Sequence, residues 1–140
     1  MLSQLIEQAD QLTIVDMEAS VEHMSRGTVR HTDTMLIVTE PYYRSLETTG
    51  RAVTLARELG IKQIYAVANK VRSPRDEEAI RRYCAERELE VIVVLPFDDA
   101  VLEADQRGTP VLDQQPDAAY VTVVDQLRIR LLGELVPQSQ

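Results

Sequence analysis

Four short runs of apolar residues recur along the chain, separated by longer segments of mixed character. Within each run the apolar residues are nearly continuous instead of alternating with polar ones, which is typical of strands covered on both faces in a parallel sheet. The runs are Leu12–Val15, Met35–Val38, Ile64–Ala68 and Val91–Leu95. This pattern predicts four strands of one mostly parallel sheet.

The segments that follow the second, third and fourth apolar runs have apolar residues at helical spacing and residues that typically start or end a helix. Glycine ends a helix at little cost because it adopts a left-handed conformation, and proline is tolerated in a first turn because its missing N–H would be unpaired there. Ser45 is expected to cap a helix that ends at Gly60, and Ser73 with Pro74 to start a helix that carries Ile80, Tyr83 and Cys84. Asp98 or Asp99 is expected to cap a short helix that ends near Gly108, and a last helix begins after Pro116 and carries Leu135. Alternating strands and helices indicate a single α/β domain over residues 1–140, with flanking helices and right-handed crossovers.

Composition and charge narrow the class of protein. The net charge of −8 over 140 residues repels nucleic acid, so no nucleic-acid partner is expected. No apolar run approaches the ~20 residues that span a bilayer, and no basic and apolar leader opens the chain, which predicts a cytoplasmic protein. The last helix is expected to pack on the core and not on a membrane, because its polar face lacks an excess of lysine and arginine. Its apolar stripe is Tyr120, Val124, Leu127, Leu131 and Leu135.

The first apolar run ends in Asp16, an arrangement found in the magnesium-coordinating strand of nucleotide hydrolases. Such an enzyme also needs a phosphate loop of the form G-x-x-x-x-G-K-[ST] upstream of that strand. The residues before Leu12 contain no glycine, and neither Lys62 nor Lys70 follows a glycine-rich loop. Because backbone N–H groups and a lysine of that loop cradle the β- and γ-phosphates, the chain alone is not expected to hydrolyse ATP. No catalytic residue is therefore assigned.

Several separated motifs together resemble one family, the nickel-insertion ATPases that mature carbon monoxide dehydrogenase, within the MinD/ParA group of deviant P-loop ATPases. The resemblance covers nearly the whole chain and keeps the order of the motifs. The chain is similar to the C-terminal half of such an ATPase. The resemblance therefore implies a partial P-loop fold that lacks the P-loop strand. The matching segments are Val15–His23 with Arg26–Thr28, Val38–Pro41 with Ser45–Thr48, Ala68–Arg72, Leu95–Val101 and Gly108–Leu112.

The resemblance also implies roles for individual residues. Asp16 would hold a water ligand of Mg²⁺, and Asn69 would read an adenine edge through its amide, which offers both a donor and an acceptor. The remaining residues of an ATP or ADP site would be Arg72, Pro96 and Asp98. Ser20 departs from the family pattern, which has glycine there.

Other interpretations of these residues stay open. Asp16 could cap a turn, Asn69 could satisfy local backbone, and Arg72 could form a surface ion pair. Glu18, Glu22 and His23 could bind a metal or belong to a solvated helix. Asp16, Thr39 and Lys70 also follow the order of residues in phosphoacceptor receiver domains, although no acidic pair precedes them.

Two functions follow from the resemblance. The chain could be the C-terminal part of an ATP-binding protein of metallocentre maturation, with a metalloenzyme as its client. Alternatively it could be a non-catalytic module that associates with an intact MinD/ParA-like ATPase. In the family the P-loop strand separates the strand ending at Asp16 from the one ending at Val38, so its absence predicts either closure of a gap or pairing with another chain, as a homodimer or higher oligomer.

Overall fold

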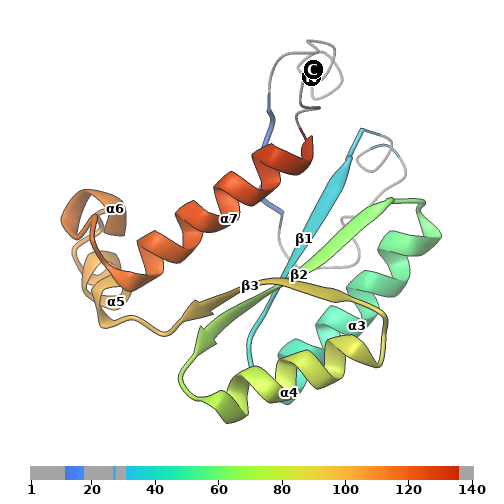
Figure 1. Ribbon diagram of the computed structural model, residues 1–140, viewed down its shortest axis with the longest axis horizontal. Coiled ribbons are helices and arrows are strands. Elements are labelled where there is room, and N and C mark those ends of the chain that lie inside the picture. Colours follow the sequence, from blue (N-terminus) through green and yellow to red (C-terminus); the bar gives the residue numbers. More distant parts are fainter. Residues whose placement is uncertain (1–11, 18–26, 28–30, 136–140) are drawn as a thin grey trace.

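A three-stranded parallel sheet lies between helices in the computed structural model, which describes residues 12–17, 27 and 31–135 (Figure 1). Ser20 and the possible metal ligands Glu18, Glu22 and His23 lie outside the described residues. The elements in chain order are β1 (Thr34–Thr39), α3 (Tyr43–Glu58), β2 (Gln63–Val71), α4 (Pro74–Ala85), β3 (Glu90–Pro96), α5 (Asp99–Gln106), α6 (Val111–Gln114) and α7 (Ala119–Leu135).

The sheet has the order β1-β2-β3, and both neighbouring pairs are parallel. Thr34 lies opposite Gln63 and Thr39 lies opposite Ala68, so β1 and β2 stay in register over the whole of β1. The predicted strands within these three elements are confirmed. Because the strands are parallel, their carboxyl ends lie at one edge of the sheet, from which the chain enters α3, α4 and α5.

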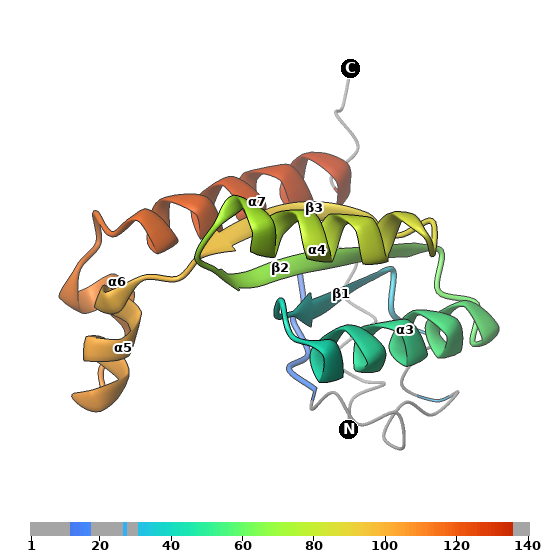
Figure 2. The ribbon, with the colours of Figure 1, turned by 90° about the horizontal axis from the view of Figure 1, so that it is seen from below.

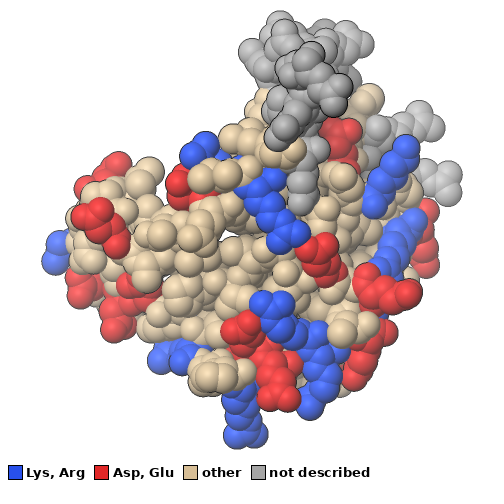
Figure 3. All heavy atoms as spheres, in the orientation of Figure 1, with Lys and Arg blue, Asp and Glu red and all other residues tan. Residues whose placement is uncertain are grey.

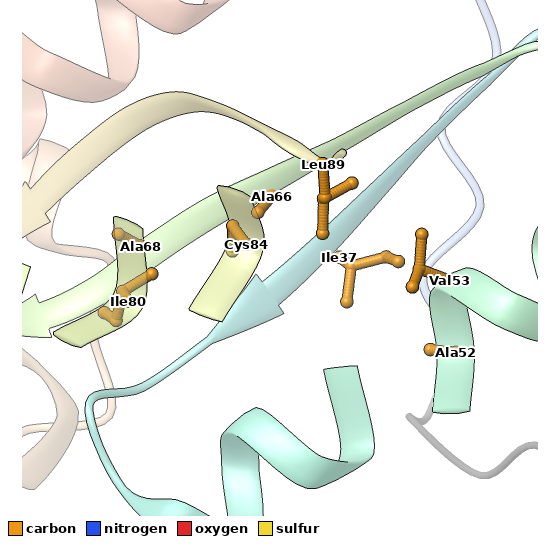
Figure 4. Packing of buried hydrophobic residues seen from close by; sticks show 8 residues of the cluster. All are labelled: Ile37, Ala52, Val53, Ala66, Ala68, Ile80, Cys84 and Leu89. Carbon is orange, nitrogen blue, oxygen red and sulfur yellow. The ribbon is translucent and has the colours of Figure 1, made fainter. Parts of the chain in front are cut away.

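Helices cover both faces of the sheet. In Figure 1, α7 lies on one side of the sheet, and α3 and α4 lie on the other; in Figure 2, α4 is seen in front of β2 and β3. Successive side chains of a strand point to opposite faces of the sheet, so the core has two parts. In β2, Ala66 and Ala68 face α3 and α4, whereas Val67 packs against α7. Figure 4 shows the larger cluster, in which Ile80 of α4 is completely buried. Burial on both faces explains the continuous apolar runs in β2 and β3.

Most of the residues expected to start or end a helix do so in the structure. Ser73 caps α4 by accepting a hydrogen bond from the Asp76 N–H at 3.3 Å, and Gly60 takes a φ of +87° after α3. Ser45 was expected to cap α3, and this is wrong. The helix begins at Tyr43, and the Ser45 hydroxyl instead accepts the backbone N–H of Glu40 at 2.8 Å.

The predicted strand Leu12–Val15 is absent. Residues 12–17 have no assigned secondary structure and are exposed, with Ile14 at 86%. An extended segment gains ladder hydrogen bonds only beside another strand, and no described strand lies beside residues 12–17. The run also does not pair with β1, so the gap expected next to β1 is not closed by the described residues.

Helix α7 packs against β3 through Tyr120, Val123, Leu127 and Leu131. Val124, expected on this face, is 38% exposed, because the helix turns Val123 toward the sheet in its place. Arg130 of α7 reaches the Ile92 carbonyl at 3.0 Å and also pairs with Glu90. The short helix α6 was not predicted.

Charge on the surface is mixed. Figure 3 shows basic and acidic side chains interspersed along the side that α3 and α4 cover, and on this face the described residues form no continuous basic stripe. Among residues 12–17, 27 and 31–135, no helix combines the length and apolar character needed to cross a membrane.

Candidate functional site

The candidate site lies at the carboxyl edge of the sheet, where β1, β2 and β3 end side by side. Ligands of open α/β sheets bind outside this edge, because the loops that follow the strands gather there. The backbone N–H of Phe97 donates to the Val71 carbonyl at 2.9 Å, which ties the end of β3 to the end of β2. The fold thus brings the Asn69–Arg72 stretch close to Pro96 and Phe97.

A bulge interrupts the ladder at the end of β2. Ala68 pairs with Val94 and Val71 pairs with Pro96, so Asn69 and Lys70 together lie opposite a single residue of β3. Lys70 has a φ of +54°, in the left-handed region that non-glycine residues rarely occupy. Bulges and left-handed residues of this kind concentrate at functional sites, where they redirect side chains.

Asn69 is one of the two residues that this bulge displaces from the regular ladder. Its side chain is half-buried, and no hydrogen bond to its amide is found among the described residues. A primary amide carries two donors and an acceptor, and partly buried polar groups are usually paired. The unpaired amide therefore fits a ligand that presents both a donor and an acceptor, such as the edge of an adenine.

Arg72 and Phe97 form a stacked pair beside the bulge. The guanidinium carbon of Arg72 lies 3.6 Å from the centroid of the Phe97 ring, within the range of a cation–π contact. The Arg72 backbone N–H donates to the Asp76 carboxylate at 3.0 Å, and this hydrogen bond holds the backbone of Arg72 in place. Arg72 forms no ion pair with any described residue, so the surface salt bridge considered from the sequence is not observed.

Asp98 joins the beginnings of two helices. One carboxylate oxygen accepts the Ala100 N–H at 2.9 Å and caps α5, as expected, and the other accepts the Tyr120 N–H at 3.1 Å. A carboxylate offers about four lone-pair positions, so Asp98 retains acceptor capacity toward a ligand hydroxyl. Pro96, directly before this loop, closes the ladder opposite Val71.

Lys70 forms an ion pair that connects the ends of β2 and β1. Its ammonium lies 2.7 Å from the Glu40 carboxylate, and the two side chains are 53% and 30% exposed. The hydrogen bond with Glu40, reinforced by the charge of Glu40, raises the pKa of Lys70 above its ordinary value of 10.5. Neither this pair nor the Arg72–Phe97 stack was predicted, because each joins residues that lie far apart in the sequence and meet only in the folded chain.

Asp16 is not brought into this cluster by any described contact. It is exposed, lies in a segment without secondary structure, and has no hydrogen bond or ion pair with another described residue. The described part of the chain also contains no group of three or more His, Cys, Asp or Glu side chains that could hold a metal ion. The chemistry of Asn69 and its neighbours therefore fits an adenine group, and no cluster of metal ligands is found within residues 12–17, 27 and 31–135.

The receiver-like set Asp16, Thr39 and Lys70 shares no described contact. Thr39 is completely buried, and its hydroxyl lies 3.3 Å from that of Ser45. Lys70 is engaged by Glu40.

Comparison with solved structures identifies the class of fold. The MinD cell division protein of Aquifex aeolicus superimposes with a TM-score of 0.64 at 18% sequence identity, over 80% of this chain and 49% of that protein. The MinD ATPase of Pyrococcus furiosus gives a TM-score of 0.61 at 25% identity, over 74% of this chain and 44% of the other. The chain thus has the fold of about half of a MinD/ParA-type P-loop ATPase.

Sequence comparison gives a narrower relationship. The carbon monoxide dehydrogenase accessory protein CooC of Rhodospirillum rubrum is 39% identical over 116 residues, which are 83% of this chain and 43% of that protein. An uncharacterized ATP-binding protein of Methanocaldococcus jannaschii is 40% identical over 112 residues, or 79% of this chain and 43% of the relative. No family model matches the chain. The chain is thus similar in sequence to CooC and to an ATP-binding protein and has the fold of MinD/ParA ATPases, and it spans less than half the length of the curated relatives it matches.

Proposed function

We propose that this chain binds an adenine nucleotide at the carboxyl edge of its sheet and takes part in metallocentre maturation. The observation that carries the proposal is the half-buried amide of Asn69, which the bulge in β2 leaves without a described partner. The maturation role, with nickel as the metal and a metalloenzyme as the client, rests on similarity to a carbon monoxide dehydrogenase accessory protein.

In this proposal each residue of the cluster has a distinct task. Asn69 donates to and accepts from the adenine edge, and the stacked Arg72–Phe97 pair forms a wall beside it. Pro96 offers a backbone carbonyl, and Asp98 accepts from a ribose hydroxyl through the lone pairs that its two helix contacts leave free. A bound ATP would supply the phosphoryl group for transfer, but none of these residues grips its phosphates.

The chain alone is therefore proposed not to hydrolyse ATP. Phosphoryl transfer needs donors around the β- and γ-phosphates and a positioned metal, and the described residues assemble neither. Release of inorganic phosphate from ATP should stay at the buffer rate, and Asp16→Ala should not change it. Steady turnover that Asp16→Ala abolishes would contradict this part of the proposal.

Calorimetric titration with ADP tests the binding site. Without a phosphate loop the dissociation constant is expected on the order of 1 mM, because the base and ribose supply most of the contacts. Asn69→Ala should weaken binding at least about fivefold, which corresponds to the loss of one hydrogen-bonding group. Gln63→Ala is the matched control, since Gln63 carries the same amide on β2 but lies opposite Thr34, at the other end of the strand. Equal effects of the two substitutions would contradict a base site at Asn69.

A second function, association with another chain, is favoured by the outer edge of β1. No described strand pairs with this edge, and the strand contains no charged residue or proline of the kind that protects exposed edges. The outer edge of β3, by contrast, receives Arg130 of α7 at the Ile92 carbonyl. We infer that β1 pairs with a strand of another chain, either a second copy or an intact MinD/ParA-like ATPase.

Substitution of Val38 tests this association. Val38 on β1 and Ile129 on α7 are both 58% exposed, so Val38→Lys and Ile129→Lys place the same charge at equally exposed positions. Sedimentation velocity should show that Val38→Lys dissociates the oligomer whereas Ile129→Lys does not. In a pull-down without nucleotide, Val38→Lys should likewise lose binding to an intact MinD/ParA-like ATPase, and Ile129→Lys should keep it. A monomeric wild-type chain that captures no ATPase would overturn the association.

A further inference from the structure

The Glu40–Lys70 ion pair joins two strand ends at the edge where the base site is proposed. Glu40 follows β1 directly, and Lys70 lies within the bulge of β2, next to Asn69. Their side chains meet at 2.7 Å. The pair therefore connects two separate loops of the site, unlike the Arg81–Glu77 pair, which stays within α4.

Lys70 occupies a backbone conformation that its side chain disfavours. A φ of +54° suits glycine, and a lysine persists there only when its surroundings hold it. The ladder does not hold it, because Asn69 and Lys70 together face one residue of β3 and break the register. The Lys70 side chain instead reaches the loop after β1 through its ion pair with Glu40.

Glu40 is well placed to hold the lysine, because its own backbone is fixed. The Glu40 N–H donates to the Ser45 hydroxyl at 2.8 Å, and that hydroxyl also lies 3.3 Å from the hydroxyl of Thr39. Thr39 is completely buried. The carboxylate therefore extends toward Lys70 from a loop that is anchored to the core and to the first turns of α3.

We propose that Glu40 and Lys70 are positioning residues, whose ion pair holds the β2 bulge in the conformation that leaves the Asn69 amide available to an adenine base. The proposal rests on the proposed function for its ligand, but the conformation of the bulge can be measured without one. Glu40 and Lys70 act through Asn69 and need no contact with the nucleotide. Direct contact of Lys70 with a phosphate group is the competing explanation.

Hydrogen–deuterium exchange of the nucleotide-free full chain tests whether the pair holds the bulge. Glu40→Gln should accelerate exchange of the backbone amides from Asn69 to Arg72 at least about threefold, because the bulge opens more often. Glu77→Gln is the matched control, since it breaks a 2.7 Å pair of similar exposure that joins no second element. Unchanged exchange in Glu40→Gln, or an equal change at the bulge in Glu77→Gln, would overturn the proposal.

Charge reversal separates positioning from direct contact. Lys70→Glu and Glu40→Lys should each weaken ADP binding roughly threefold to tenfold, and the double variant should recover most of the affinity because the ion pair is restored with its charges exchanged. If Lys70 contacts a phosphate, the double variant should stay as weak as Lys70→Glu, since residue 70 is then negative. That result would also overturn the positioning role.

The two experiments distinguish failure of this inference from failure of the proposed function. If the wild-type chain does not bind ADP, the proposed function fails and the role in base binding fails with it. The exchange rates would still decide whether Glu40 holds the bulge. If the wild type binds ADP through Asn69 but no charge variant changes affinity or exchange, the base site stands and the positioning role is wrong.

Discussion

Gly50 in α3 faces Tyr83 of α4, and this contact makes a substitution that usually stabilises a helix destabilising here. A Cβ atom at residue 50 would lie 2.5 Å from the Tyr83 hydroxyl oxygen and 3.0 Å from Nε of Arg87. The Tyr83 ring cannot move aside freely, because the Arg87 guanidinium stacks on it at 3.5 Å and its hydroxyl contacts Glu47. Gly50→Ala therefore tests the packing of α3 against α4.

The magnitude follows from two opposing effects. Replacing glycine by alanine inside a helix stabilises by about 0.5–1 kcal/mol, whereas overpacking a fixed contact costs about 1–3 kcal/mol. The expected net result is a loss of about 1 kcal/mol in the free energy of unfolding. In a Tyr83→Phe background the 2.5 Å contact is gone and the nearest ring atom is Cζ at 3.5 Å, an ordinary contact. The Arg87 side chain at 3.0 Å must still shift by a few tenths of an ångström, so Gly50→Ala should there stabilise by at most about 0.5 kcal/mol.

Urea unfolding followed by circular dichroism measures this double-mutant cycle. The expected coupling between residues 50 and 83 is about 1–2 kcal/mol. Equal stabilisation by Gly50→Ala in the wild-type and Tyr83→Phe backgrounds would show that the hydroxyl does not oppose the new methyl group, and it would refute the described packing of α3 on α4.

Two further predictions concern the core and the ion pair at the sheet edge. Ile80→Ala should lower the free energy of unfolding by about 2–5 kcal/mol, because Ile80 is completely buried between α4 and the sheet; a loss below about 1 kcal/mol in urea unfolding would contradict this burial. Glu40 raises the pKa of Lys70 in the folded protein above the pKa near 10.5 of a lysine in the unfolded chain. The ion pair should therefore stabilise the folded state fully at a pH below 10.5, and this stabilisation should be lost as the pH rises through the higher pKa of the folded state. The difference in stability between wild type and Glu40→Gln should therefore stay constant up to about pH 10 and shrink as the pH rises above the ordinary lysine pKa, and an unchanged difference at alkaline pH would contradict it.

The sequence predicts much of the fold where local chemistry and burial agree. Ser73 followed by Pro74 marks the start of α4 because the hydroxyl cap and the proline both suit a first turn, and Gly60 marks the end of α3. The continuous apolar runs in β2 and β3 correctly report burial on both faces. These signals depend on residues that are neighbours in the chain.

The incorrect predictions depend on what surrounds a segment. Leu12–Val15 has the composition of a buried strand, but composition does not supply the neighbouring strand with which it would pair. Ser45 has the side chain of a helix cap, yet its hydroxyl binds the Glu40 N–H, because the preceding loop turns back onto the first turn of α3.

At the candidate site, too, the sequence pointed to individual residues but not to the contacts between them. Motif resemblance drew attention to Asn69, Arg72, Pro96 and Asp98, and the fold places the loops that carry them at one edge of the sheet. The left-handed turn at Lys70, the ion pair with Glu40 and the stacking of Arg72 on Phe97 came only from the structure. Each depends on residues brought together from separate elements.

The most direct test of the central claim is an NMR titration of the isotope-labelled chain with ADP and with adenosine. If the adenine base binds at Asn69, the Asn69 side-chain amide and the backbone amides of residues 69–72, 97 and 98 should show saturable shifts. Signals at the opposite end of the sheet should change little, and the shifts should be lost in Asn69→Ala. Adenosine should produce most of the same shifts, because Asn69, Arg72, Pro96 and Asp98 are proposed to contact the base and ribose and not the phosphates. Absence of shifts at this edge, or the same shifts in Asn69→Ala, would contradict an adenine site on this chain.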